Sequence, residues 1–237
     1  MKVLILFLLL VSPILINAQA IRIPDPAFRQ RLIALGYDEN DNGKIEVSEV
    51  KDVTDLDLTN LGIVNLEGIN SFMNLRELQI PQNKIAKLDV SKLKNLQGLY
   101  AWDNPLTDVN VTGLTKLKNL YVQNFGGPYG IELSYLKTLD VSTLTSLEDL
   151  RCSNNRITSL DVSGLQNLQK IECRFNLLNS VNLTKAPNLK SVDISKNPLE
   201  ITVDIRGLMY LEYFNCRECS LLFLNMSGTV RLKEIDW

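Results

Sequence analysis

The stretch from Leu147 to Leu165 reads LEDLRCSNNRITSLDVSGL and sets the pattern for most of the chain. Over its first places apolar residues alternate with polar ones, and Asn155 stands at the ninth place. Alternation with period two is typical of a β-strand that has one buried face. An amide at the end of such a strand can pair turn backbone groups that would otherwise be buried without partners. The stretch therefore predicts a strand, a turn and a short return limb.

The same pattern recurs along residues 53–237. Its copies begin at Val53, Leu75, Leu96, Leu117, Leu147, Leu168, Leu189, Leu211 and Leu232. Neighbouring starts are 21 or 22 residues apart, except that 30 residues separate Leu117 from Leu147. A fixed period of this size predicts a solenoid whose units bury their apolar edges against one another. We expect about eight copies and a partial ninth, with an insertion near residues 125–133.

The repeated pattern is LxxLxLxxNxL. It is followed by Leu75, Leu78, Ile80, Asn83 and Ile85, and by Leu189, Val192, Ile194, Asn197 and Leu199. This pattern resembles the leucine-rich repeat family, and the segment NLEGI at residues 65–69 resembles secreted or surface bacterial proteins of the internalin type. The resemblance implies an α/β solenoid, a leucine-rich repeat horseshoe with a parallel concave β-sheet.

The return limbs, such as LDVS at residues 160–163, are short and rich in Asp, Ser and β-branched residues. These residues disfavour a long helix. We therefore expect extended and 3-10 segments on the convex side of the solenoid.

The first twenty residues have the order of a secretory signal peptide. Lys2 precedes an apolar run from Val3 to Ile16, and Ala18-Gln19-Ala20 follows as an A-x-A cleavage site. The run is too short to span a membrane comfortably, although an uncleaved anchor remains the alternative. We expect a mature chain that begins at Ile21 and is secreted, periplasmic or on the outer cell surface.

Residues 21–52 do not carry the repeat and are expected to form a helical N-terminal cap. Asp25 suits a helix N-cap with Pro26 at the first helical position, and Gly36 suits the helix end. An amphipathic helix laid across the open end of a solenoid removes its apolar surface from water.

Residues 38–49 read DENDNGKIEVSE and match the spacing D-x-[DN]-x-[DN]-G-x5-E. This segment resembles an EF-hand or dockerin-type calcium loop, and the alternative is a turn between two short helices. The resemblance implies one structural Ca²⁺ with a modest, extracellular-type affinity, because two ligands are neutral amides. The implied ligands are Asp38, Asn40, Asn42, the Lys44 carbonyl, Glu46 and Glu49, and Gly43 permits the sharp turn.

The outward positions three, five and seven of each copy predict which side chains lie on the concave face. Neighbouring copies bring aromatic residues together there, beside the insertion, and exposed aromatic and Arg residues are enriched at binding hot spots. The alternative is that these rings pack on one another. The predicted ligand-binding residues are Tyr100, Trp102, Tyr121, Gln123, Phe125, Tyr129, Arg151 and Arg174.

Three of the four cysteines, Cys152, Cys173 and Cys216, occupy the inward sixth place of their copies. Cys219 occupies the ninth place, where Cys is an accepted substitute for Asn. We expect buried free thiols, while a bond between Cys152 and Cys173 is the open alternative in an exported protein.

The composition argues against several function classes. The chain has a net charge of −2, which leaves no basic stripe for nucleic acid. It contains no His, so a Ser-His or Cys-His pair is excluded, and no phosphate-binding loop is found. The sequence therefore predicts a non-enzymatic recognition or adhesion module for a protein or glycan ligand. The alternative is a structural surface spacer or assembly component without a selective ligand.

Overall fold

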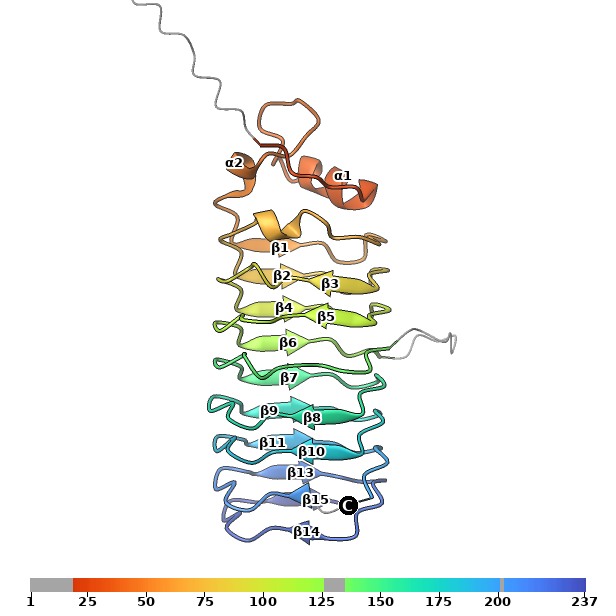
Figure 1. Cartoon of the computed structure of the whole chain (residues 1–237), viewed down its shortest axis with the longest axis vertical. Helices are drawn as coiled ribbons and strands as arrows, with labels where there is room; N and C mark the ends of the chain where they lie inside the picture. Colours follow the sequence, from red (N-terminus) through yellow and green to blue (C-terminus); the bar gives the residue numbers. More distant parts are fainter. Residues whose placement is uncertain (1–18, 126–134, 201–202) are drawn as a thin grey trace, which may run out of the picture.

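A computed structural model of the chain describes residues 19–125, 135–200 and 203–237. The copies stack along the long axis of the molecule, with the two helices at the N-terminal end (Figure 1). One continuous cluster of buried apolar side chains runs through the stack from Ile23 to Leu224. The predicted parallel-sheet solenoid with little helix is confirmed.

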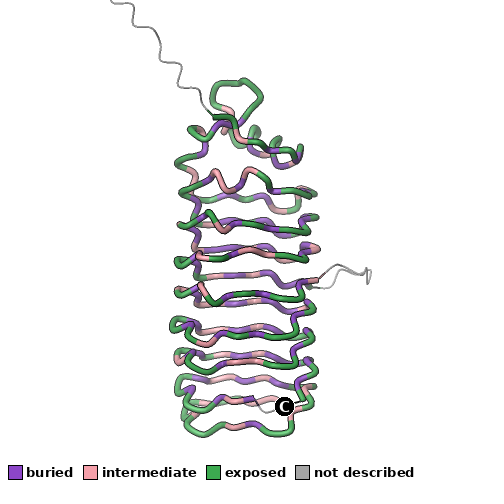
Figure 2. Tube along the Cα trace, viewed as in Figure 1, coloured by how far each residue is buried: buried purple, intermediate pink, exposed green. Residues whose placement is uncertain are grey.

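The main sheet contributes one short strand per copy, and all its neighbouring strands are parallel. Its middle residue is buried in every strand except the last, where Ile235 is half-buried, and buried and less buried positions alternate along the tube in Figure 2. The strand order is β1 (Asp55–Asp57), β2 (Glu77–Gln79), β4 (Gly98–Tyr100), β6 (Asn119–Tyr121), β7 (Asp149–Arg151), β9 (Lys170–Glu172), β11 (Ser191–Asp193), β13 (Tyr213–Asn215) and β15 (Glu234–Asp236).

The return limbs form a second face, here called the second limb. As predicted, it is made of extended segments, and these pair into three small parallel sheets. The pairs are β3 (Lys87–Asp89) with β5 (Asp108–Asn110), β8 (Ser159–Asp161) with β10 (Ser180–Asn182), and β12 (Val203–Asp204) with β14 (Leu224–Asn225). A single 3-10 turn, η1 (Ile69–Ser71), occurs among the described residues.

The ninth-place asparagines form a buried ladder through the stack. The Nδ2 group of Asn176 donates to the Cys173 carbonyl of its own copy at 3.2 Å and to the Cys152 carbonyl of the preceding copy at 3.0 Å. Its Oδ1 accepts from the backbone N–H of Ile157 at 3.0 Å. Because each amide ties two copies, the ladder fixes the register of stacking. The same arrangement recurs at Asn83, Asn104, Asn155 and Asn197.

The predicted cap helix is confirmed as α1 (Pro26–Ala34), and a second short helix is α2 (Val47–Val50). Asp25 is the N-cap of α1, and its carboxylate accepts from the Phe28 N–H at 3.0 Å. The other carboxylate oxygen accepts from the N–H groups of Val64 and Asn65 at 2.8 and 3.1 Å. Asp25 therefore starts the helix and also joins it to the first coil.

The four cysteines are free thiols, three of them buried, as expected. The hydrogen bond to Cys173 and burial raise the pKa of Cys152, and burial raises the pKa of Cys216 to about 12. Thiols with raised pKa values are poor nucleophiles at neutral pH. Cys219 takes the ladder position, where its Sγ lies 3.2 Å from the Ile194 carbonyl.

Two expectations fall on residues outside the described ranges. The predicted signal peptide lies almost entirely within residues 1–18, and most of the predicted insertion lies within residues 126–134. The return limb after the insertion is described, and its apolar residues are buried as expected. These are Leu136, Leu139, Val141 and Leu144.

Candidate functional site

Tyr100, Trp102 and Tyr121, here called the aromatic patch, lie together on the outer face of the main sheet. The Tyr100 and Tyr121 ring centroids are 5.1 Å apart, and those of Tyr100 and Trp102 are 6.1 Å apart. Both contacts are edge-to-face, so the rings pack on one another and are half-buried. Leu99 and Leu120 beside them point into the core. The patch is thus a preformed apolar surface on a rigid sheet, in the geometry that aromatic pairs favour.

Arg151 and Asp149 complete the patch on the side of β7. The Arg151 guanidinium lies 4.4 Å from the Tyr121 ring centroid and pairs with Asp149 at 2.9 Å. The Tyr121 hydroxyl also donates to Asp149 at 2.9 Å. Burial and this hydrogen bond to the Asp149 carboxylate raise the pKa of Tyr121 to about 12, so the phenol stays protonated. The three side chains form a closed ring of interactions.

Glu77 approaches the patch from β2, and the sequence did not single it out. Its carboxylate lies over Gly98, where a Cβ atom would sit within 3 Å of both Glu77 and Tyr100. The missing side chain at position 98 thus leaves a notch in which the Glu77 carboxylate lies beside the Tyr100 ring. Burial raises the pKa of Glu77, and nearby Asp55 adds to this shift. The sequence feature that could have indicated this contact is Gly98, a glycine at an outward position of a strand.

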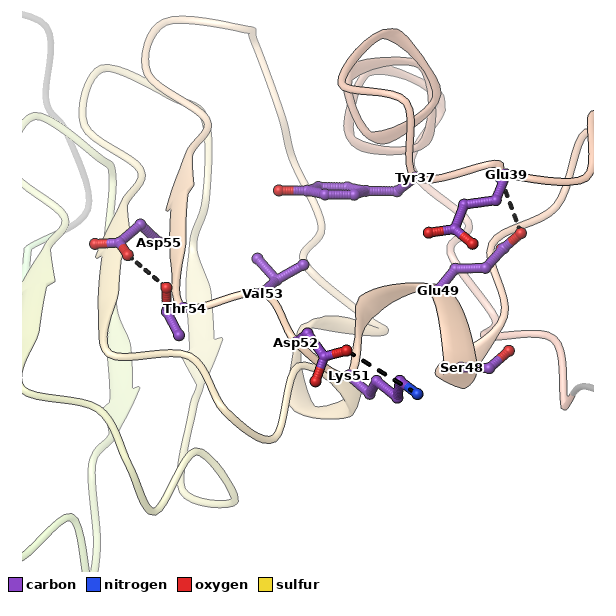
Figure 3. A pocket seen from close by; sticks show the side chains of 9 residues that line it. All are labelled: Tyr37, Glu39, Ser48, Glu49, Lys51, Asp52, Val53, Thr54 and Asp55. Carbon is purple, nitrogen blue, oxygen red and sulfur yellow. Dashed lines mark hydrogen bonds and ion pairs between the residues drawn. The ribbon is translucent and has the colours of Figure 1, made fainter.

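An open groove of about 740 Å³ lies between the cap and the first coil. Figure 3 shows Tyr37 above Val53, with Glu39 and Glu49 on the cap side and Asp55 on the β1 side. The remaining lining residues are Ser48, Lys51, Asp52 and Thr54. The groove therefore has four carboxylates and one ammonium group.

The other predicted ligand-binding residues differ in their exposure. Arg174 is exposed, and the Phe125 side chain is 63% exposed where the chain leaves the described residues. Tyr129 lies outside the described residues. Gln123 is only 6% exposed, so the prediction that it faces outward is wrong.

The error at Gln123 has a structural reason. Position seven follows the end of the three-residue strand, so the alternation of inward and outward side chains no longer applies there. The equivalent residues Pro81, Ser153 and Ser195 are buried as well, whereas Trp102 is half-buried and Arg174 and Arg217 are exposed. The direction of the side chain at this place therefore differs from copy to copy. The Gln123 Oε1, Asn124 Oδ1 and Ser153 Oγ atoms are buried without hydrogen-bond partners among the described residues.

The predicted calcium-loop residues are drawn together by hydrogen bonds. Asp38 accepts from the backbone N–H groups of Asn42 and Gly43, at 3.0 and 2.9 Å, which closes the turn. The Asn40 amide donates to both Glu46 and Glu49, at 3.2 and 3.1 Å, and the Asn42 amide donates to Glu46 at 2.9 Å. No contact places the Lys44 carbonyl in this network. Five of the six predicted ligands therefore share one hydrogen-bonded cluster.

The two glutamates of this loop are close neighbours with opposite pKa shifts. The pKa of Glu46 is lowered, chiefly by the hydrogen bond from Asn42. The pKa of Glu49 is raised by burial and by contact with Glu46. No three His, Cys, Asp or Glu side chains among the described residues are grouped for metal binding by themselves. A cation here would need the amide oxygens of Asn40 and Asn42, which hard cations such as Ca²⁺ accept. The oxygen donors present thus fit Ca²⁺ once both amides rotate.

No helix within residues 19–125, 135–200 and 203–237 combines the length and the apolar character that a bilayer crossing requires.

Comparisons with known proteins agree with the repeat architecture. A family described as the leucine-rich repeat domain of the endo-beta-N-acetylglucosaminidase EndoS matches residues 23–155, and a general leucine-rich repeat family matches residues 146–168. No curated protein matches the chain.

Solved structures with similar folds include internalin C2 of Listeria monocytogenes. That structure is 22% identical, with a TM-score of 0.66, and the match covers 90% of this chain and 92% of the internalin chain. A leucine-rich repeat protein of Leptospira interrogans is 22% identical with a TM-score of 0.62, and the match covers 81% of this chain and 51% of that one. At 22% identity, these similarities show that this chain shares the fold of the two structures.

The first family match spans more than half of the chain and includes the cap and the aromatic patch. Leucine-rich repeat folds are typical of protein-interaction modules. On these grounds the chain belongs to the leucine-rich repeat family described as the EndoS LRR domain.

Proposed function

We propose that this chain is a secreted or cell-surface recognition or adhesion module without enzymatic activity, which binds a protein or glycan through the concave face of the main sheet. The observation that supports this most is the aromatic patch of Tyr100, Trp102 and Tyr121, held on a rigid parallel sheet. Aromatic side chains with an adjacent Arg are the residues that most often dominate binding energy at interfaces. Phe125 and Arg174 extend the proposed surface. Tyr129 lies outside the described residues and stays a prediction from the sequence.

A triple replacement of Tyr100, Trp102 and Tyr121 by Ala tests this function. Because these rings lie outside the core cluster, we expect the melting temperature to fall by no more than a few degrees. We expect binding to cells or to a glycan array to fall at least about tenfold, since two lost hot-spot contacts cost more than about 1.4 kcal/mol.

The matched control replaces three exposed aromatic residues elsewhere, Phe175, Tyr210 and Phe223, by Ala. This control should keep the binding of the natural chain. If both triple variants bind equally well, the face is not the binding surface, and a structural spacer or assembly component becomes the better account.

We also propose that the loop at residues 38–49 holds a single structural Ca²⁺ through Asp38, Asn40, Asn42, Lys44, Glu46 and Glu49. The support is the hydrogen-bonded cluster and, above all, the two adjacent glutamates Glu46 and Glu49, whose carboxylates both accept from the Asn40 amide. A cation placed between these carboxylates would remove their repulsion. Because the loop lies beside the groove in Figure 3, the ion would fix the cap on the first coil.

Calcium should therefore raise the thermal stability of the chain. With a dissociation constant of about 0.5 mM, 10 mM Ca²⁺ would stabilise the fold by about 2 kcal/mol relative to chelator. Glu49→Ala should abolish this difference, whereas Glu39→Gln, a carboxylate replacement outside the ligand set, should keep it. Melting curves of the three proteins in calcium and in chelator make the measurement. Equal melting of the natural chain under both conditions would rule the site out.

A further inference from the structure

The outward positions of the first four main-sheet strands carry acids but no basic residue. Positions three and five of β1, β2, β4 and β6 hold three carboxylates, three uncharged polar or glycine residues and two tyrosines. We call Asp55, Asp57 and Glu77 the acidic patch. None of the three takes part in an ion pair with a described residue. Arg31 approaches Asp57, but its Nε donates to the Asp57 backbone carbonyl at 3.4 Å.

The next strands of the same face neutralise their own charges. Asp149 pairs with Arg151 at 2.9 Å, and Lys170 pairs with Glu172 at 2.6 Å. Toward the C-terminal end of the face, Asp193 on β11 and Glu234 and Asp236 on β15 again have no ion pair with a described residue. On the N-terminal half of the face, the unpaired negative charge lies beside the aromatic patch. It continues into the groove of Figure 3, which four carboxylates line.

The two tyrosines of the patch have corresponding environments that differ in one group. Tyr121 bonds to the carboxylate of Asp149 at position three of the next strand, and Arg151 at position five of that strand covers its ring. The Tyr100 ring lies beside the carboxylate of Glu77 at position three of the preceding strand, above Gly98. Position five of that strand is Gln79, which is exposed and uncharged. The arrangement around Tyr100 thus has the ring and the carboxylate but lacks the guanidinium.

We infer that this half of the face, formed by the acidic patch and the aromatic patch, docks a protein segment that presents arginine side chains. One arginine would lie over Tyr100 and pair with Glu77, repeating the arrangement of Arg151 with Tyr121 and Asp149. A second would reach Asp55 or Asp57 on β1, because neighbouring strands are about 4.8 Å apart. The inference rests on the proposed function and specifies its ligand as a cationic protein segment.

The energetics favour an arginine over a neutral ligand. The half-buried Glu77 carboxylate has lost part of its hydration without gaining a cation, so pairing it would recover that cost. A guanidinium can accept the planar ring contact and the bidentate pairing together, whereas an ammonium group offers only a point charge. Association should also weaken with added salt, because the acidic patch is in part solvent-exposed.

The test uses the full chain and two synthetic peptides, acetyl-Gly-Arg-Gly-Arg-Gly amide and its citrulline counterpart, which keeps the side-chain shape but lacks the charge. Backbone and Trp102 indole N–H shifts are followed by NMR during each titration. We expect saturable shifts confined to β1, β2, β4 and β6 with the arginine peptide and none with the citrulline peptide.

Two variants and a control sharpen the result. Glu77→Gln removes the carboxylate charge, and Gln79→Arg supplies the absent guanidinium within the chain. Each should weaken arginine-peptide binding about tenfold, the scale of one charge-assisted contact with a stacked ring. Asp108→Asn, which removes an exposed carboxylate on the second limb, should leave binding unchanged. Unchanged melting temperatures of all three variants show that folding is intact.

Equal shifts with both peptides, no shifts with either, or unchanged affinity in Glu77→Gln would each overturn the inference. These outcomes are separate from the test of the proposed function. If the triple aromatic replacement abolishes glycan binding while the arginine peptide fails to bind, recognition through this face stands and the cationic ligand is wrong. If the triple replacement has no effect on cell or array binding, the proposed function itself fails.

Discussion

At the scale of single residues, Asn155 shows how one side chain ties two neighbouring copies of the repeat together. Its Nδ2 group donates to Val122 and Cys152 carbonyls, each at 3.0 Å, and its Oδ1 accepts from Leu136 N–H at 3.2 Å. All of these groups belong to buried residues, so none of them can form a hydrogen bond to water if the amide is removed. A buried polar group left without its partner costs about 1–3 kcal/mol.

We therefore predict that Asn155→Ala lowers the free energy of unfolding by about 3 kcal/mol, the cost of several unpaired buried groups after partial relaxation. Asn188→Ala is the control, since this exposed amide makes one hydrogen bond, to the Gln166 carbonyl at 2.7 Å. Its effect should stay below about 1 kcal/mol. Equilibrium unfolding in urea measures the free energy of unfolding of both variants. Similar losses of stability in the two variants would show that the buried ladder contributes no more than an exposed hydrogen bond.

At the scale of elements, α1 is joined to the solenoid through its own N-cap. Burial alone would raise the pKa of Asp25, but backbone N–H groups of Phe28, Val64, Asn65 and Ala27 together lower it. A carboxyl group with a lowered folded-state pKa stabilises the fold above its unfolded pKa, about 3.9, and this contribution is lost as the pH falls through the folded value.

Asp25→Ala should accordingly cost about 2–3 kcal/mol at pH 7, because it removes a helix cap and two further charge-assisted hydrogen bonds. The difference between this variant and the natural chain should stay constant from pH 7 to about pH 5 and shrink below about pH 4. Melting temperatures across this range make the measurement. A difference that persists undiminished at pH 2 would contradict the role given to the charge.

The strands and α1 were predictable because each follows from local pattern. Alternation around Leu78 or Leu150 defines a buried strand position, and Asp25-Pro26 defines a helix start. The contacts between copies were not predictable in this way. The burial of Gln123 depends on the chain path beyond the strand end, and the approach of Glu77 to Tyr100 depends on the space above Gly98. Both are properties of the stacked molecule.

At the scale of the whole molecule, the stack places its charges unevenly along one face. The acidic patch and the aromatic patch adjoin each other near the cap, and paired charges follow on β7 and β9. On β11 and β15, Asp193, Glu234 and Asp236 again have no ion pair with a described residue. The sequence predicted the aromatic patch, because register alone puts Tyr100 beside Tyr121. It did not predict which charges are paired, since Arg151 could have met either Asp149 or Glu172.

The most direct test of the binding face is hydroxyl-radical footprinting of the free chain and of the chain bound to a ligand selected on cells or a glycan array. We predict that Tyr100, Trp102 and Tyr121 are oxidised in the free chain and protected in the complex, while exposed Phe175 and Phe223 react equally in both. Rings that resist oxidation in the free chain, or protection that falls on Phe175 and Phe223 instead, would contradict the account.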